Sequence, residues 1–187
     1  MLKLDKAHQN YTIFIIYYAC ITNFLIETMY LKEIDIRWSD IDANRHLANS
    51  AYLNFMSHTR MAFLGELGFN QKSFAKYNMG PVVFHEHIYY FREAFAGKPI
   101  KVSLEIVGLS EDGKFFEFHH NFYDANGKHF AHCEIMGGWM DLKERKLIGL
   151  SQEFLKKFDA VKKPASFKVL TKEHTRKFAK VPKDLEV

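Results

Sequence analysis

The sequence predicts an α+β domain in which an antiparallel sheet wraps around one long central helix. A single long amphipathic pattern runs from Asn49 to Glu66, and four strand-like segments follow it. Two of the joints between these segments carry Asp112-Gly113 and Asn126-Gly127. Such dipeptides are typical of tight hairpin turns, so we expect neighbouring strands to be antiparallel.

The first element is a strand predicted over Tyr30 to Trp38. Apolar and charged residues alternate here, which places Ile34, Ile36 and Trp38 on one face and charged side chains on the other. Strict alternation is the pattern of a strand with one face buried.

The second element is the helix of residues 49–66, which begins at Asn49. Its apolar stripe has helical spacing, and Gly65 and Gly68 are typical stop signals. The stripe consists of Ala48, Tyr52, Phe55, Thr59, Ala62 and Phe63. At 1.5 Å per residue the helix is about 27 Å long, enough to cross a sheet.

The remaining elements are four long strands and a short helix. The strands are predicted over Val82–Phe91, Ile100–Leu109, Lys114–Asp124 and His129–Leu142, after a loop that ends at Gly80-Pro81. Gly137-Gly138 inside the last strand indicates a bulge or a close backbone approach. Ser151 is placed to be the N-cap of a helix from Gln152 to Phe158. The long helix can bury its stripe only against this sheet.

The loop before the long helix is the candidate site. It presents Asp40, Asp42, Asn44 and His46, and the helix starts at Asn49. A helix N-terminus carries unpaired N–H groups and a partial positive charge, so it stabilises an oxyanion. A carboxylate and an imidazole beside such a group favour acyl chemistry. These residue types also shape turns and cap helices without any catalytic role, and the loop alone leaves both interpretations open.

This loop carries a resemblance to a known family. Residues 37–52 read RWSDIDANRHLANSAY, which is similar to the D-x-D-x-N-x-H-x-N-N-x-x-Y signature of plant acyl-ACP thioesterases. More broadly, the chain resembles bacterial hotdog acyl-CoA thioesterases of the 4-hydroxybenzoyl-CoA thioesterase type. Further similar segments are Gly80–Val83, Tyr90–Glu93 and Gly138–Leu142. The resemblance extends from about Tyr30 to Phe158.

The resemblance implies a hotdog fold and the hydrolysis of a fatty or aryl acyl-CoA to free acid and CoA, without a cofactor. It assigns the catalytic carboxylate, as general base or nucleophile, to Asp42, with Asn44 and His46 as its assistants. Substrate contacts fall on Asn49, at the helix N-terminus that faces the thioester carbonyl, and on Tyr52. It also implies a homodimer or a dimer of dimers.

The chain departs from the family pattern in two places. Many bacterial members have Gly-rich residues after the aspartate and a histidine at the position of Asn49, and this chain has neither. The plant enzymes use a downstream Glu-Cys pair, whereas Cys133-Glu134 is in the reverse order. The residues that assist Asp42 therefore remain open.

Three other functions compete with an acyl-CoA thioesterase. A hotdog hydratase would need D-x-N-P-x-H, but His46 lies four residues after Asp42 and Arg45 stands in place of proline. An acyl-ACP thioesterase and a non-catalytic acyl-CoA or acyl-carrier binding protein would share the fold, and only activity separates them.

We divide the chain into an apolar extension (residues 1–28), a hotdog thioesterase domain (29–160) and a basic tail (161–187). The apolar run Tyr11–Ile26 has 16 residues, whereas a membrane span needs about 20. No clear A-x-A cleavage site follows it, so an extension or packed helix is favoured over a signal or anchor. Residues 162–187 hold eight Lys/Arg and three Asp/Glu, a charge of 8 − 3 = +5. Such a tail suits phosphates, an acidic carrier or plain solvation.

Composition limits the remaining possibilities. The 48% hydrophobic content predicts a folded globule, and two cysteines, Cys20 and Cys133, without a disulfide framework fit a cytoplasmic protein. We expect no nucleic-acid or membrane partner.

Among ten histidines, His85 and His87 share a strand face, and His119 and His132 lie on neighbouring predicted strands. No H-x-x-x-H helix or Cys/His cluster accompanies them, so we expect no metal site.

Overall fold

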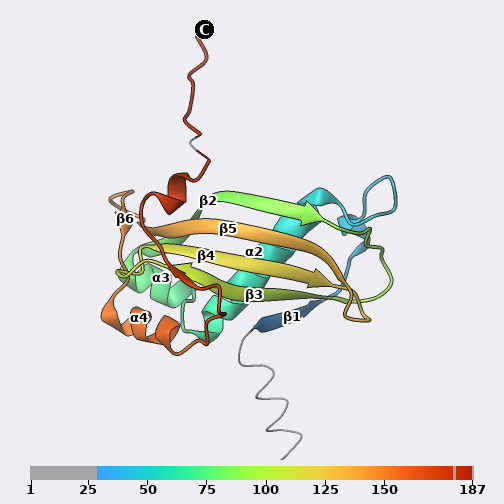
Figure 1. Ribbon diagram of the computed structural model, residues 1–187, viewed down its shortest axis with the longest axis horizontal. Helices are drawn as coiled ribbons and strands as arrows, with labels where there is room; N and C mark the ends of the chain where they lie inside the picture. Colours follow the sequence, from blue (N-terminus) through green and yellow to red (C-terminus); the bar gives the residue numbers. More distant parts are fainter. Residues whose placement is uncertain (1–28, 179, 187) are drawn as a thin grey trace, which may run out of the picture.

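The computed structural model describes residues 29–178 and 180–186, so the predicted extension of residues 1–28 lies outside the described residues. Its main feature is one antiparallel sheet with the strand order β1-β3-β4-β5-β2 (Figure 1). The strands are β1 (Tyr30–Ile34), β2 (Met79–Tyr90), β3 (Ile100–Leu109), β4 (Phe115–Tyr123) and β5 (His129–Asp141).

Shorter elements complete the fold. The helices are α2 (Asn49–Glu66), α3 (Gln71–Tyr77) and α4 (Gln152–Asp159), with 3-10 turns η1 (Trp38–Asp40) and η2 (His174–Arg176). The two-residue strand β6 (Leu147–Ile148) pairs with β5, and β7 (Lys168–Val169) runs parallel to β3. β7 and the buried Leu170 bring residues beyond 160 against the sheet.

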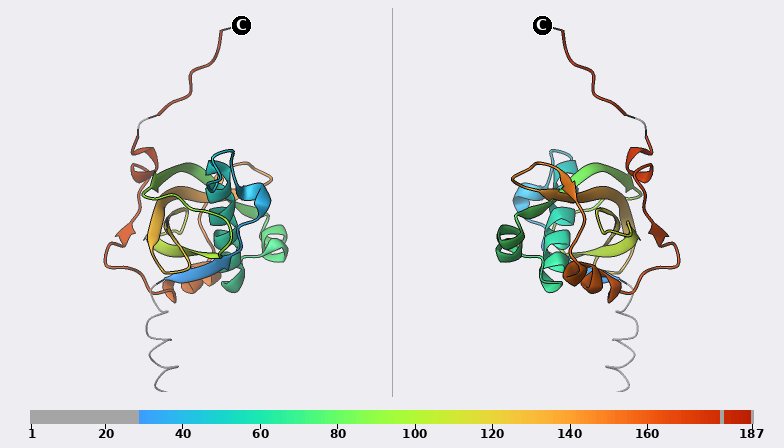
Figure 2. Two further views of the ribbon diagram at one scale, coloured as in Figure 1. Left: turned by 90° about the vertical axis from the view of Figure 1, so that its right-hand side faces the viewer. Right: turned by 90° about the vertical axis from the view of Figure 1, so that its left-hand side faces the viewer.

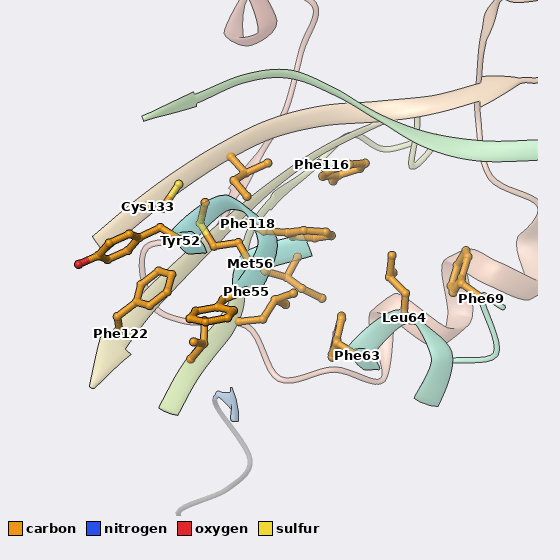
Figure 3. Close-up of a cluster of buried hydrophobic side chains, with 14 of the residues drawn as sticks. Tyr52, Phe55, Met56, Phe63, Leu64, Phe69, Phe116, Phe118, Phe122 and Cys133 are labelled. Atoms are coloured by element: carbon orange, nitrogen blue, oxygen red, sulfur yellow. The ribbon is translucent and has the colours of Figure 1, made fainter. Parts of the chain in front are cut away.

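Helix α2 lies along one face of the curved sheet, and the C-terminal segment, residues 168–178, lies on the opposite face (Figures 1 and 2). The core lies between α2 and the strands and is strongly aromatic (Figure 3). Its labelled members are Tyr52, Phe55, Met56, Phe63, Leu64, Phe69, Phe116, Phe118, Phe122 and Cys133. Each fully buried side chain of this size contributes about 1.5–3 kcal/mol, so the packing of α2 on the sheet contributes substantially to stability.

Alternation along β4 explains the two faces of the sheet. Phe116, Phe118 and Phe122 are buried in the core. The intervening His119 and Asn121 are only partly buried and belong to the other face.

The prediction that the first strand continues to Trp38 is wrong. β1 ends at Ile34, η1 begins at Trp38, and the Trp38 side chain is 92% exposed. The cause is Asp40, whose carboxylate accepts hydrogen bonds from the backbone N, Nε and Nη2 of Arg37 at 2.8, 3.1 and 2.9 Å. These bonds turn the chain before it can extend the strand.

Two further differences lie between α2 and the sheet. Helix α3 was not expected, and β2 begins at Met79, so that Gly80-Pro81 belongs to the strand rather than to a loop. Proline is compatible with a strand at the edge of a sheet, where its missing N–H leaves no ladder bond unmade, and β2 is an edge strand.

Other local predictions are confirmed. Gly113 and Gly127 adopt positive φ angles of 66° and 77° in the two hairpin turns. The close backbone approach expected near Gly137 is present, because a Cβ atom there would lie 2.5 Å from the Phe116 ring and from the Val82 carbonyl oxygen. Ser151 occupies the N-cap position of α4, although its side chain makes no capping bond.

Among residues 29–178 and 180–186, we find no helix with the length and apolar character that a membrane crossing requires.

Candidate functional site

The loop that precedes α2 is closed by its own backbone. The Asp42 N–H donates to the carbonyl of His46 at 2.9 Å, and Ile41 and Leu47 form an isolated antiparallel bridge. Arg45 has a φ angle of 66°, a left-handed conformation that this reversal requires. The result is a tight turn that places residue 42 a short distance from the start of the helix.

The Asp42 carboxylate both shapes this turn and faces outward. Its Oδ1 accepts the N–H groups of Asn44 at 2.8 Å and His46 at 3.1 Å. Within the described part of the chain, no group donates to Oδ2. One oxygen therefore fixes the side chain and the other is free to act on a ligand.

Asp40 also holds a turn, but unlike Asp42 it is buried. It is 4% exposed, and its carboxylate is held by Arg37. The hydrogen bonds and charge of Arg37 outweigh the effect of burial and lower the pKa of Asp40. Asp40 thus has the structural role that the loop sequence left open for both aspartates.

The N-terminus of α2 offers free hydrogen-bond donors. Ala48 is the N-cap residue and has no side-chain cap, and its own N–H donates to the Asp40 carbonyl at 2.8 Å. The N–H groups of Asn49 and Ser50 have no acceptor among the described residues. Unpaired first-turn amides carry a partial positive charge and bind an anion or a carbonyl oxygen.

Asp42 and Asn49 line one open pocket of about 330 Å³. Of the five predicted site residues, it brings together Asp42, His46, Asn49 and Tyr52, and Asn44 is not among its lining residues. The other lining residues are Leu47, Tyr90, Phe91, Arg92, Glu93 and Ala94.

His46 is tied to the segment that follows β2. Its Nε2 lies 3.5 Å from Oε1 of Glu93, and its ring packs edge-on against Phe95 with centroids 5.1 Å apart. The N–H of Leu47 donates to the Ala94 carbonyl at 2.8 Å, which joins the two segments. Sequence reasoning missed Glu93 as a partner of His46, because the only signal was the resemblance of the Tyr90–Glu93 segment.

Tyr52 forms the inner wall of the pocket. It is 3% exposed and packs edge-on against Tyr90 at 5.0 Å and at a tilt against Phe122 at 5.2 Å. Burial, together with Tyr90, raises its pKa to about 12, so the phenol is neutral at physiological pH. Figure 3 shows its hydroxyl oxygen at the margin of the aromatic cluster.

A second pocket of about 340 Å³ adjoins the first and shares Arg92, Glu93 and Ala94 with it. Lys98 and Lys128 also line it, so its walls carry three cationic side chains beside the two carboxylates of Glu93 and Asp124. Such a wall is suited to phosphate groups.

The curved antiparallel sheet around one long helix is the hotdog fold, as the resemblance implied. The 1,4-dihydroxy-2-naphthoyl-CoA thioesterase Slr0204 of Synechocystis aligns with a TM-score of 0.64 and 17% identity, covering 73% of this chain and 99% of its own. A hypothetical protein of Staphylococcus aureus, solved in complex with CoA, aligns with a TM-score of 0.68 and 16% identity over 84% and 97%. YbaW, a probable thioesterase of Escherichia coli, gives 0.58 and 22% over 70% and 97%.

The family follows from the sequence. The model of the thioesterase-like superfamily matches residues 36–158, more than half of the 187 residues. The chain belongs to this superfamily. No curated protein matches the sequence.

Proposed function

We propose that the protein is a thioesterase that hydrolyses an acyl-CoA to a free acid and CoA in the pocket at the N-terminus of α2. The observation that carries the proposal is the pairing of two groups in that pocket. The free Oδ2 of Asp42 supplies a base or nucleophile. The unpaired N–H of Asn49 in the pocket, with that of Ser50 next to it in the first turn of α2, supplies an oxyanion site.

The proposed reaction needs little more than these groups, because a thioester is already activated. The helix N–H groups donate hydrogen bonds to the carbonyl oxygen and stabilise the negative charge that develops on it. Asp42 removes a proton from water as the water oxygen bonds to the acyl carbon, and the C–S bond then breaks. The proton passes to the departing thiolate. In the alternative, Asp42 attacks directly and forms a mixed anhydride that water hydrolyses. His46 and Asn44 are proposed to assist, and His46 is the one that lines the pocket.

Two observations support CoA as the carrier. One structural neighbour was solved with CoA, and another is named for a CoA thioester of an aromatic acid. In addition, Arg92, Lys98 and Lys128 line the pocket beside the site, where they suit the phosphates of CoA. We propose that CoA occupies this second pocket while the acyl group enters the first.

The decisive measurement is thiol release from short, medium, long-chain and aryl acyl-CoAs by the native protein and by Asp42→Asn. We expect kcat/KM to fall by at least about 100-fold in the variant, because a positioned general base contributes about 10²–10⁴-fold. Asparagine keeps an oxygen that accepts the two loop N–H groups, so the fold should persist. Asp35→Asn, at an exposed carboxylate outside the pocket, is the matched control and should turn over normally.

Other outcomes distinguish the alternatives. Equal turnover by Asp42→Asn and the native protein would refute Asp42 as the catalytic group. Activity on acyl-ACP alone, falling steeply with salt, would identify a carrier-protein substrate docked by basic residues. Ligand binding without turnover of either thioester would leave an acyl-binding protein.

A further inference from the structure

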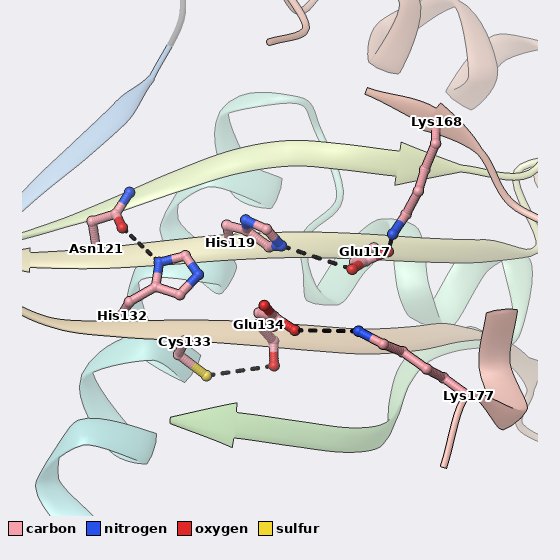
Figure 4. Close-up of polar contacts among 8 residues, drawn as sticks. All are labelled: Glu117, His119, Asn121, His132, Cys133, Glu134, Lys168 and Lys177. Atoms are coloured by element: carbon pink, nitrogen blue, oxygen red, sulfur yellow. Dashed lines mark hydrogen bonds and ion pairs between the residues drawn. The ribbon is translucent and has the colours of Figure 1, made fainter. Parts of the chain in front are cut away.

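Polar side chains gather on the face of the sheet that is turned away from α2. His119 of β4 stands directly opposite Glu134 of β5, and Asn121 of β4 stands opposite His132 of β5. Because side chains alternate along a strand, these four residues share one face. Figure 4 shows them side by side there, with Lys168 and Lys177 reaching toward Glu117 and Glu134.

Three of these residues have the spacing of a metal site. Ligand atoms of His119, His132 and Glu134 all lie within 4.8 Å of one another, and all three residues are half-buried. The two imidazole rings stand edge to face at 89°, with centroids 4.9 Å apart. Bonds of about 2.0–2.2 Å in a tetrahedral Zn²⁺ site put ligand atoms roughly 3.4 Å apart. Small side-chain rotations are therefore enough to bring the three ligand atoms to the distances that Zn²⁺ requires.

The imidazoles also have the outer partners that metal-binding histidines have. Nδ1 of His132 lies 2.7 Å from Oδ1 of Asn121, and since an amide oxygen only accepts, Nδ1 carries the proton. Nε2 of His132 is then left with its lone pair. Nε2 of His119 faces the carboxylate of Glu117 at 3.7 Å. The hydrogen bond between His132 and Asn121 is of the kind that orients a ligating imidazole and raises its affinity for a metal.

We propose that His119, His132 and Glu134 form a binding site for a divalent transition-metal ion, with Zn²⁺ as the best-matched probe. Two imidazoles and one carboxylate leave a fourth position for water or a ligand. Sequence reasoning gave no metal site because no local motif joins these residues. It is the register of β4 on β5 that brings them together.

The surrounding charges are compatible with a cation. Glu117 lies beside the site, with Oε1 3.7 Å from Nε2 of His119 and Oε2 2.6 Å from Nζ of Lys168. Glu134 is now paired with Lys177 at 3.8 Å, and that lysine is 59% exposed. An exposed ion pair contributes only about 0–1 kcal/mol, so a metal can replace Lys177 as the partner of Glu134 at little cost.

The site is separate from the proposed catalytic pocket. None of His119, His132 and Glu134 lines that pocket, and α2 lies on the other face of the sheet. The inference therefore stands whether or not the protein is a thioesterase.

The test is calorimetric titration of Zn²⁺ into the full chain after removal of metals with a chelator. We expect one tight site per chain, and His132→Ala and Glu134→Gln should each weaken it at least about tenfold. Asn121→Ala keeps all three ligands but loses the orienting bond, and should weaken binding by about 10–100-fold. His58→Ala removes an exposed histidine on α2 and is the matched control, which should bind as the native chain does.

Two results would overturn the proposal. One is the absence of Zn²⁺ binding by the native chain. The other is unchanged binding by the double variant His119→Ala/His132→Ala, which would place any bound metal elsewhere. Far-ultraviolet circular dichroism checks that each variant is folded. Because Asn121 and Glu134 are substituted separately from the histidines, loss of fold in one variant leaves the others to decide.

Discussion

Asp40 and Asp42 show how two identical residues in one loop take different roles. Asp40 is buried and bonded to Arg37, whereas Asp42 bonds to backbone N–H groups through one oxygen and lines a pocket. Their sequence context is nearly the same, so the difference arises from the direction in which the chain turns at η1. Catalysis and stability should therefore separate cleanly between the two positions.

The role of Asp40 predicts a specific pH dependence of stability. Its pKa is lowered in the folded state, mainly by Arg37, so its contribution is present above the unfolded pKa of about 3.9 and is lost as the pH falls through the lower folded value. We expect Asp40→Asn to destabilise the protein by about 1–3 kcal/mol at pH 7. The variant should also lose less stability than the native protein between about pH 5 and pH 2.

Urea unfolding at several pH values measures this effect. Asp35→Asn, at an exposed carboxylate, should follow the native curve and serves as the control. Parallel curves for Asp40→Asn and the native protein would contradict the assignment.

At the scale of elements, long patterns were predictable from the sequence and short ones were not. Helix α2 and strand β3 have the predicted bounds, because each carries a sustained period and clear end signals. Strand β7 has only two residues and was missed, since two residues cannot display a period. β1 was predicted too long because alternation continues to Trp38, while the side chain of Asp40 turns the chain earlier.

The candidate site shows the same division. Asp42, His46, Asn49 and Tyr52 lie within eleven residues, so local reasoning could place them at one helix end. Glu93 reaches the site only through the pairing of its segment with the loop. Contacts set by register and tertiary packing leave no local signature in a single sequence.

We expect glycine-to-alanine substitution to change the stability of the protein in opposite directions at two positions. In Gly137→Ala the new methyl would lie 2.5 Å from the Phe116 ring and from the Val82 carbonyl oxygen, which is backbone and cannot swing aside. We expect a loss of about 1–3 kcal/mol, as for other overpacked cores. At Gly65 in α2, a methyl group would meet nothing within 4 Å, so Gly65→Ala should stabilise the protein by about 0.5–1 kcal/mol.

Thermal unfolding of both variants beside the native protein tests this pair. A higher unfolding midpoint temperature for Gly137→Ala would contradict the expected clash and show that the sheet can shift to admit the methyl group. A fall for Gly65→Ala would show that the end of α2 does not behave as ordinary helix.

At the scale of the whole molecule, β2 is an open edge of the described sheet. Apolar side chains along it are exposed, among them Val83 (42%), Tyr89 (46%) and Tyr90 (49%). An uncovered edge of this kind favours pairing with another chain. The homodimer or dimer of dimers inferred from the sequence stays a prediction, and β2 is the surface on which we place the contact.

Light scattering during gel filtration measures the assembly. We expect the native protein at a multiple of the 22.0 kDa chain mass, and Val83→Lys shifted toward the monomer. Val169→Lys introduces the same charge at an exposed residue on β7, the opposite side of the sheet, and should leave the mass unchanged. A native monomer, or equal dissociation of both variants, would contradict the placement.

The outer edge of β3, unlike that of β2, is covered by two short strands of the same chain. Its first half pairs with β1 and its second half with β7, so the first and last described strands share one edge, end to end. On the ribosome, β3 has its N-terminal partner from the outset but must wait for residues 168–169 to emerge before the rest of its edge is covered. Until then the nascent sheet exposes half of this strand. Completion of this fold is therefore tied to the last part of its synthesis, and a chain that stops before residue 168 would keep a site for unwanted strand pairing.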